Sequence, residues 1–339
     1  MPALRSDIDP DGLMEFSVVF TDRSLNHMSK AFQKVMTDIH ATLCEVYHAD
    51  TAVVVPGGGT YAMEAVARQI AGGEDVMVIR NGFFSFRWSQ IFEAGAIPKS
   101  QTVLKARRTG NEITAPFAPA PLEEAVAEIH ALKPAAVFAP HVETASGMIL
   151  PDGYIRALSD AVHEEGGLMV LDCIASGCAW VDMKATGVDV LISAPQKGWS
   201  AQPSAGLVML SERATSVVKS RQSSSFAIDL GKWLTIMEAY LAGGHAYHAT
   251  MPTDALRAFR DAMLETKDYG FAKLSEAQWE QGRRVRALLK ARGFQSVAAE
   301  GVEAPGVVVC YTDDPEIQSG RAFAALGMQI AAGVPLQCD

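Results

Sequence analysis

The sequence lacks the long apolar runs of membrane spans and the N-terminal pattern of secreted proteins. No stretch approaches the roughly 18 consecutive apolar residues that a transmembrane helix needs. The N-terminus, MPALRSDIDPDGLMEF, is acidic and is interrupted by Pro10 and Gly12, so it has neither the basic start nor the apolar core of a secretory signal. We therefore expect a soluble, intracellular protein of the cytoplasm.

Cysteine is scarce and follows no pattern of disulfide pairing or metal binding. The five cysteines are an odd number and have no CxxC spacing. Cys173 and Cys178 lie near each other in the sequence, but no His or further Cys is placed to complete a zinc site. We expect buried, reduced thiols and no metal.

Clusters of Lys and Arg interleaved with aromatic residues are also missing. The formal net charge is −10, so a nucleic acid is not an expected partner. The chain has 339 residues and 49% hydrophobic content, which is enough to bury a large core and to form two domains.

Between residues 51 and 210, short apolar runs alternate with helix-like segments. The runs, which read as strands buried on both faces, are TAVVV, DVMVI, AAVFAP, LMVLD, DVLIS and GLVML. The expected helices between them are 60–70, 84–94, 122–132 and 154–165. This alternation predicts an α/β fold with a mainly parallel sheet flanked by helices. The last two runs have a short connection, so one of these strands is expected to be antiparallel.

Helical periodicity is found on both sides of the sheet region. Residues 29–48 and 253–292 have helical periodicity, with Gly270 as a break in the latter. We then expect a strand at GVVVCY, a helix over 315–326 and a strand at MQIAAG. The change near residue 266 predicts a large domain over 1–265 and a smaller, incomplete α/β domain over 266–339.

The most informative segment is DVLISAPQKGWSAQPSAGLVML, residues 189–210, in which Lys197 occupies a turn between two apolar runs. Asp172 ends the preceding run, LMVLD. A lysine amine forms a Schiff base with the aldehyde of pyridoxal phosphate, and a carboxylate facing the pyridine nitrogen keeps the ring able to accept electrons. Taken singly, the two residues are equally compatible with a solvated lysine and a turn-capping Asp. Together they predict a pyridoxal phosphate site with Lys197 and Asp172 as catalytic residues.

Other strand ends supply matching groups. PGGGT, residues 56–60, opens a helix and could bind an anion through glycine N–H groups, with a tight turn as the alternative. NGFF, residues 81–84, offers an aromatic that could stack on a planar ring, with a core role as the alternative. HVETASG, residues 141–147, offers hydroxyl groups. A phosphorylated pyridine aldehyde requires all of these groups, and chance rarely places so many consistently.

At this point the chain resembles the class V aminotransferases, the group of alanine–glyoxylate and serine–glyoxylate aminotransferases. SAPQKGWSAQPSAG is the most specific element, and Gln before the lysine is typical of the group, whereas cysteine desulfurases usually carry His there. The resemblance implies the fold of pyridoxal-phosphate-dependent transferases (fold type I). The implied roles are phosphate contacts by Gly58, Gly59, Thr60 and Gln196, ring contacts by Phe84, Thr144, Asp172 and Ile174, and the Schiff base of Lys197.

The resemblance also implies a homodimer with shared active sites. YHAT, residues 247–250, is similar to the family segment that reaches the neighbouring subunit, so Tyr247 and Thr250 would complete the phosphate site of the partner. From the residues alone, this segment reads as a polar turn before a helix.

Three departures from the family pattern affect these expectations. Phe84 stands where Trp or Tyr is common, and EFSVVFTDRSLNHM replaces a Pro/Gly-rich N-terminal segment. The family's C-terminal arginine, which binds the substrate carboxylate, has no counterpart after Arg321. We expect either that the chain is a shortened form or that another arginine, Arg23 or Arg87, takes this role.

The predicted function is a pyridoxal-phosphate-dependent aminotransferase that moves an amino group from a small amino acid to a 2-oxo acid such as glyoxylate or pyruvate. One alternative is a lyase or cysteine desulfurase of the same fold, which would need a reactive thiolate. Another is a non-catalytic binding module that retains the fold.

Overall fold

The computed structural model describes residues 24–338, which form two compact units. Unit 1 comprises residues up to Gly72 together with Trp180–Leu274, and unit 2 comprises Gly73–Ala179 together with the residues from Ser275 onward. Each unit is therefore built from two separate stretches of chain. The domain boundary expected near residue 266 stays a prediction.

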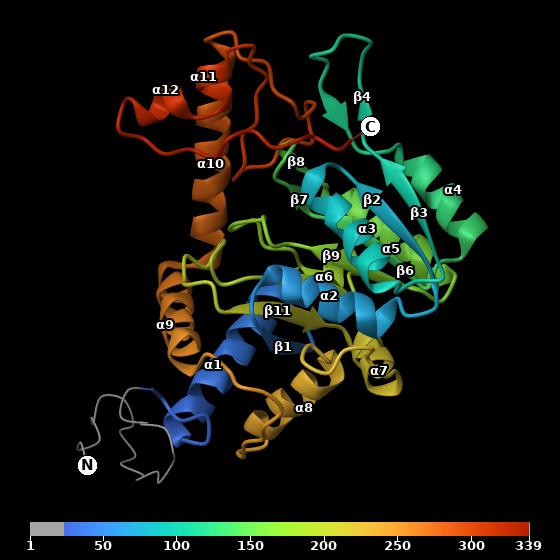
Figure 1. Ribbon diagram of the computed structural model, residues 1–339, viewed down its shortest axis with the longest axis vertical. Coiled ribbons are helices and arrows are strands. Elements are labelled where there is room, and N and C mark those ends of the chain that lie inside the picture. The colour runs from blue at the N-terminus through green and yellow to red at the C-terminus, as the bar shows by residue number, and fades with distance from the viewer. Residues whose placement is uncertain (1–23, 339) are drawn as a thin grey trace. The chain divides into compact units, whose positions relative to one another are not determined.

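The core of unit 1 is an antiparallel group of three strands with β11 in the middle. β1 (Thr51–Pro56) and β10 (Val190–Ser193) both pair with β11 (Ala205–Leu210), and Val208 lies opposite Val53 on one side and Ile192 on the other. The antiparallel pairing of β10 and β11 confirms the expectation drawn from their short connection. The helices of this unit pack around the strands (Figure 1), and those in contact with them include α2 (Gly59–Ile70), α7 (Glu212–Ser220) and α8 (Leu230–Leu241).

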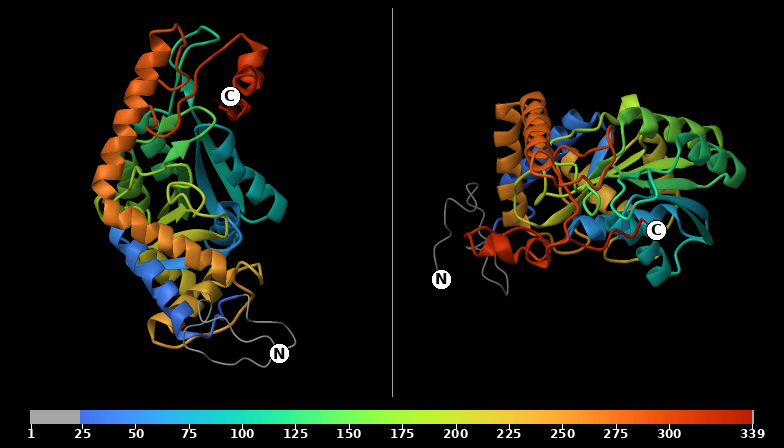
Figure 2. Two further views of the ribbon diagram at one scale, coloured as in Figure 1. Left: turned by 90° about the vertical axis from the view of Figure 1, so that its left-hand side faces the viewer. Right: turned by 90° about the horizontal axis from the view of Figure 1, so that it is seen from above.

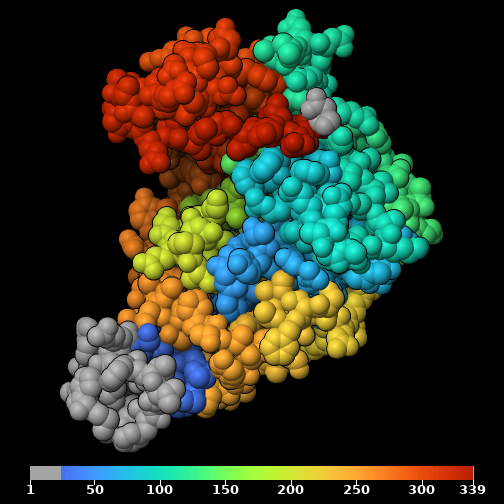
Figure 3. All heavy atoms as spheres, viewed as in Figure 1, coloured from blue at the N-terminus to red at the C-terminus, as the bar shows by residue number. Residues whose placement is uncertain are grey.

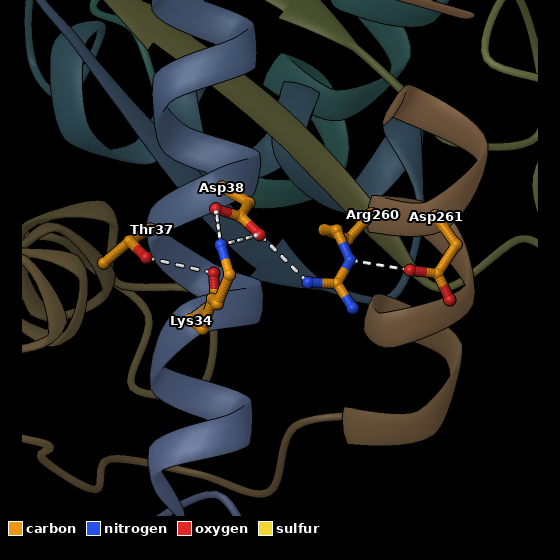
Figure 4. A network of polar contacts seen from close by, with 5 residues as sticks. All are labelled: Lys34, Thr37, Asp38, Arg260 and Asp261. Atoms are coloured by element: carbon orange, nitrogen blue, oxygen red, sulfur yellow. Dashed lines mark hydrogen bonds and ion pairs between the residues drawn. The ribbon is translucent and has the colours of Figure 1, made fainter. Parts of the chain in front are cut away.

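α1 (Lys30–Tyr47) and α9 (Thr253–Tyr269) pack against each other in unit 1. α1 begins at Ser29, whose side chain accepts a hydrogen bond from the backbone of Phe32, and its buried face is the apolar stripe predicted from the sequence. Figure 4 shows the polar contacts between the two helices. Arg260 Nη1 lies 2.9 Å from Asp38 Oδ2, and Lys34 also pairs with Asp38. Both ends of the Arg260–Asp38 pair are largely shielded from solvent, so this pair contributes more than a fully exposed one.

Unit 2 contains four parallel strands in the order β9, β6, β2, β3. Their bounds are Leu168–Asp172, Ala136–Pro140, Asp75–Arg80 and Ser100–Lys105. The views in Figure 2 show α3 (Phe83–Gly95) on one side of these strands and α4 (Leu122–Leu132) with α5 (Asp152–Glu164) on the other. Because the strands are parallel, their carboxyl ends lie at one edge, where ligands of such sheets bind.

Unit 2 also holds two short hairpins and the C-terminal residues. β4 (Arg107–Arg108) pairs with β5 (Phe117–Ala118), and β7 (Val142–Glu143) pairs with β8 (Met148–Ile149). A small core joins these hairpins to Cys338, and Figure 3 shows the C-terminal residues (red) against the β3 to β5 region (teal). Its buried members are Ala106, Phe117, Met148, Val297, Ala298 and Cys338.

The six expected strands and the helix break at Gly270 are confirmed. α10 (Phe271–Lys290) follows Gly270, whose φ is 107°. The strands expected at 306–311 and 328–333 are wrong, because the first finds only an isolated bridge between Ser296 and Cys310 and the second finds no pairing among the described residues. A β-rich run becomes a strand only when a neighbouring strand supplies its hydrogen bonds.

The helix expected over 315–326 is interrupted. It forms two short helices, α11 (Pro315–Gln318) and α12 (Arg321–Ala324), because Gly320 between them takes a left-handed conformation with φ 80°. Within residues 24–338, no helix is both long enough and apolar enough to cross a membrane.

Candidate active site

In unit 1, Lys197 lies in the turn that follows buried β10, as predicted. Its side chain is exposed, and the turn is closed by hydrogen bonds from Lys197 N to Ala194 O (3.4 Å) and from Ser200 N to Lys197 O (3.1 Å). Ser200 has a φ of 54°, so the chain reverses sharply just beyond the lysine. The local backbone therefore fixes the base of the side chain while its amine reaches outward.

Trp199 anchors this turn two residues after Lys197. Its side chain is only 1% exposed. The ring centroid lies 5.0 Å from that of Trp180, 6.1 Å from that of Phe259 and 6.2 Å from that of Phe271. Such a large buried aromatic side chain resists displacement, so the lysine turn is held by the core of unit 1.

The glycine loop of unit 1 joins β1 to α2. Gly57 has a φ of 122°, and a Cβ there would lie 2.6 Å from Tyr61 Cγ, so this position requires glycine. Gly58 is the N-cap of α2, with no side-chain cap and no acidic residue in the first turn. A Cβ added to Gly58 would meet no atom within 4 Å, so space remains in front of the helix N-terminus.

This arrangement fits the phosphate group of pyridoxal phosphate. The first N–H groups of a helix have no intrahelical partner and carry a partial positive charge. Gly59 is buried in the first turn and the neighbouring Thr60 is exposed, so its hydroxyl is accessible to a ligand. Gly58, Gly59 and Thr60 therefore offer the donors that an anion needs.

The sequence analysis missed Ser204, which lies between the lysine turn and β11. Its backbone oxygen accepts a hydrogen bond from Gly57 N (3.0 Å). Its buried hydroxyl oxygen, like Gln196 Oε1 in the lysine turn, has no hydrogen-bond partner in the described part of the chain. Two unpaired polar atoms in these connected turns are the usual sign of a missing ligand or water.

β11 fixes the position of this helix N-terminus. A Cβ on Gly206 would lie 2.3 Å from Ala62 Cβ and 2.8 Å from Gly58 O. Only glycine permits this close approach of the strand to the first turn of α2. The glycine loop and the strand after the lysine turn are thus held together by direct packing.

Tyr247 and Thr250 lie in the exposed loop between α8 and α9. Tyr247 is 67% exposed, its hydroxyl oxygen lies 3.5 Å from Thr250 Oγ1, and its ring contacts that of His27. Both residues nevertheless remain exposed. Their contact with a second subunit stays a prediction.

In unit 2, Asp172 ends β9 at the carboxyl edge of the parallel strands and is 8% exposed. Its Oδ1 accepts a hydrogen bond from Ile174 N (2.9 Å), and its backbone oxygen accepts one from His141 N (2.8 Å). These bonds orient the carboxylate and hold the half-buried side chain of Ile174 near it. A carboxylate of this kind could pair with a protonated ring nitrogen.

The loop after Asp172 is held by two residues that the sequence analysis assigned no role. His141 Nδ1 lies 2.7 Å from Ser176 Oγ, and burial lowers the pKa of His141 to about 4. Gln278 accepts a hydrogen bond from Cys178 N (2.9 Å) and donates one to Ser176 O (3.1 Å). A polar side chain 100 residues downstream gives no signal in a local pattern.

Phe84 and Thr144 also belong to unit 2. Phe84 is half-buried in the first turn of α3, where the guanidinium of Arg87 lies 5.1 Å from its ring centroid. Thr144 is half-buried in the β7–β8 turn. Buried Glu143 connects these two positions through hydrogen bonds to the backbone of both segments. Arg23, the other candidate for the substrate carboxylate, lies outside the described residues.

The predicted residues therefore form two groups, each within one unit. Unit 1 holds the lysine turn and the glycine loop, and unit 2 holds the groups expected to contact the ring. The family model described as aminotransferase class-V matches residues 15–310. The chain belongs to this family. The predictions of a pyridoxal-phosphate-dependent transaminase and of amino-group transfer to a 2-oxo acid are thereby confirmed.

Known relatives of this class V aminotransferase carry different names. It is 26% identical over 316 residues to the small subunit of a soluble hydrogenase from Synechococcus sp. (strain PCC 6716), with 91% of this chain and 77% of that protein covered. It is 27% identical over 280 residues to the 2-aminoethylphosphonate–pyruvate transaminase of Syntrophobacter fumaroxidans, with 81% and 71% covered. These relatives share the family, and their names do not agree on a substrate.

The fold of this class V aminotransferase matches solved structures of the family. Alanine–glyoxylate aminotransferase from Nostoc sp. superposes with a TM-score of 0.75 at 23% identity, covering 88% of this chain and 76% of that one. This confirms the predicted fold of pyridoxal-phosphate-dependent transferases.

The cysteines do not have the character of a desulfurase nucleophile. Burial raises the pKa of the Cys310 thiol, although nearby Arg286 favours its thiolate. Cys338 is fully buried, and its sulfur lies 3.3 Å from Asn81 O. Neither thiol is presented as an exposed, reactive group.

Proposed function

We propose that this aminotransferase moves the amino group of a small amino acid to glyoxylate or pyruvate, with Lys197 as the residue that binds the cofactor covalently. The observation that carries this proposal is the exposed Lys197 on a turn anchored by buried Trp199, after a buried strand of a class V aminotransferase. The relative from Syntrophobacter fumaroxidans is named for pyruvate, and the Nostoc structure of the same fold is named for glyoxylate.

Pyridoxal phosphate, when bound, supplies an electron sink that stabilises negative charge at the substrate α-carbon. Lys197 would hold the cofactor in the resting enzyme. Once released from it, its Nζ would take the proton from the substrate α-carbon and would later return a proton. The exposed amine has the freedom that such proton transfer needs, and the fixed backbone keeps it near the reacting atoms.

The remaining residues bind and orient the cofactor. Gly58, Gly59 and Thr60 would bind the phosphate through the open N-terminus of α2, with Gln196 beside them. Asp172 would pair with the ring nitrogen and keep it protonated. The ring contacts would come from Phe84, Thr144 and Ile174.

Dimerisation and location belong to the same proposal. Exposed Tyr247 and Thr250 are placed on a loop where a second subunit could use them, so we infer a homodimer whose sites are shared. We also infer a cytoplasmic enzyme, in keeping with the reduced cysteines expected from the sequence.

Borohydride reduction followed by peptide mapping tests the role of Lys197. The reduced protein should carry a pyridoxyl group on the peptide that contains Lys197, and Lys197→Ala should lose both the label and turnover. Lys273→Ala, which alters an exposed lysine on α10, is the matched control and should keep both. A label on another lysine would contradict the assignment.

Absorbance spectra test the substrates and the rival functions. Addition of alanine, serine or aspartate should convert the bound cofactor to its amino form, and addition of glyoxylate or pyruvate should reverse the change. A desulfurase would instead release sulfide from cysteine, and a non-catalytic module would bind the cofactor without either change.

A further inference from the structure

Glu143 is a fully buried carboxylate that accepts four hydrogen bonds, and no cofactor contact is expected from it. It is 0% exposed, on β7 of unit 2. Oε1 accepts from Phe84 N (3.1 Å) and from Ala145 N (3.0 Å). Oε2 accepts from Ser85 N (2.8 Å) and from Ser85 Oγ (2.7 Å).

These bonds join two segments that are distant in sequence. Phe84 and Ser85 form the first turn of α3, and Ala145 follows Thr144 in the β7–β8 turn. Glu143, on the hairpin that carries Thr144, therefore accepts hydrogen bonds from N–H groups in the first turn of α3, which have no partner within the helix. Both oxygens are needed, because Oε1 accepts from Phe84 and Ala145. Oε2 accepts both the N–H and the hydroxyl of Ser85.

The surrounding chain is shaped to admit this carboxylate. A Cβ on Gly82 would lie 2.7 Å from Glu143 Cγ, so the residue before α3 must be glycine for Glu143 to approach. Ser146 Oγ, in the β7–β8 turn, makes a further hydrogen bond to the segment before α3 by donating to Asn81 O (2.9 Å). The two segments are thus fixed relative to each other by several bonds within unit 2.

We propose that Glu143 is a positioning residue that fixes the separation between the Phe84 ring and the Thr144 hydroxyl, so that both can contact the cofactor ring at once. This inference rests on the proposed ring contacts of Phe84 and Thr144. Glu143 acts through these two residues and does not touch the cofactor. A carboxamide has one acceptor oxygen in place of two, and Asp is one methylene shorter, so neither can reproduce all four bonds.

The test compares holoenzymes of the wild type, Glu143→Gln and Glu143→Asp, with Glu276→Gln as an exposed control on α10. The affinity for pyridoxal phosphate is measured by absorbance titration, and the visible circular dichroism of the cofactor is recorded at saturation. Both readouts are taken at a temperature at which far-ultraviolet circular dichroism shows each variant to be folded. We expect Glu143→Gln to raise the Kd at least about tenfold and to reduce the visible dichroic signal, with a smaller effect for Glu143→Asp.

The dichroic signal at saturation separates positioning from stability. A purely structural role would lower the Tm and leave the signal of the bound cofactor unchanged. If Glu143→Gln does not fold, Ser85→Ala should show a smaller change of the same sign, because it removes one of the four donors together with the acceptor of Asn81 N and Gly82 N. A Kd within twofold of the wild type and an unchanged dichroic signal in the folded variants would overturn the inference. Failure of the wild type to bind the cofactor through Lys197 would instead overturn the proposed function.

Discussion

The rings of Trp199 and Trp180 pack in unit 1 with centroids 5.0 Å apart and planes inclined by 42°. Trp180 is itself fixed by a hydrogen bond from its Nε1 to Phe271 O (3.1 Å). The lysine turn is therefore anchored to an aromatic cluster at the start of α10. The position of Lys197, the proposed catalytic residue, therefore depends on apolar packing two residues away.

Trp199→Ala should destabilise the protein and weaken cofactor binding together. Loss of a fully buried tryptophan costs about 3–5 kcal/mol of the free energy of unfolding. Trp199→Phe should cost much less, because Trp199 Nε1 has no hydrogen-bond partner in the described residues and an aromatic ring remains. Urea unfolding and cofactor titration measure the two effects. Full stability in Trp199→Ala would contradict the anchoring role.

Gly58→Ala should separate anion binding from folding. The extended backbone of Gly58 (φ −169°) accepts any residue, and a Cβ meets no atom within 4 Å, so the loss of stability should stay within about 1 kcal/mol. The added methyl group would occupy the space expected for the phosphate, and the Kd for pyridoxal phosphate should rise at least about tenfold. Gly153→Ala, at another open position, is the control and should bind normally. Normal binding by Gly58→Ala would place the phosphate elsewhere.

Asp172→Asn should slow turnover while preserving the fold. The substitution removes the charge and keeps the shape, so the hydrogen bond from Ile174 N can persist. Without a charge to keep the ring nitrogen protonated, turnover should fall at least about tenfold, equivalent to about 1.4 kcal/mol of barrier. Steady-state rates at saturating cofactor measure this. An unchanged rate would mean that Asp172 only shapes the turn.

His141 should make stability depend on pH. Burial lowers the pKa of its imidazole from 6.5 to about 4 in the folded protein, so the unfolded chain binds the proton more readily between these values. The contribution is therefore present above pH 6.5 and is lost as the pH falls towards 4, by about 3 kcal/mol in total. His141→Asn, which cannot titrate, should flatten the Tm profile in this window. A Tm profile as steep in His141→Asn as in the wild type would contradict this role.

Tyr247 and Thr250 should act on the active site of the partner subunit. Lys197→Ala and the double variant Tyr247→Ala/Thr250→Ala should each be inactive. After subunit exchange at equal concentrations, half of the dimers are mixed and each has one intact site, so activity should recover to about a quarter of the wild-type value. If mass spectrometry shows that subunits have exchanged but activity does not recover, the active sites are not shared.

The sequence predicted the strands and the candidate residues better than the contacts between them. Continuous apolar runs such as LMVLD identify buried strands, and parallel pairing then brings their carboxyl ends to one edge. Within its own unit, Asp172 is the last residue of β9, and Lys197 lies in the turn that follows β10.

Long-range polar contacts had no local signal. Glu143 reads as one polar residue of HVETASG, and its partner Phe84 N lies 59 residues earlier. The same separation in sequence hid the hydrogen bond from Gly57 N to the backbone oxygen of Ser204. The run at 306–311 failed for the opposite reason, since its local β pattern was strong but no strand within residues 24–338 pairs with it.

The two hydrogen bonds between Gln278 and the loop after Asp172 have a consequence for biosynthesis. Gln278 follows Cys178 by 100 residues, and ribosomes add roughly 5–20 residues per second. The loop is therefore synthesised about 5–20 seconds before the side chain that closes it. During that interval, Asp172 and Ile174 lie on a loop that lacks its hydrogen bonds to Gln278. We therefore expect the cofactor to load late, after α10 has emerged from the ribosome.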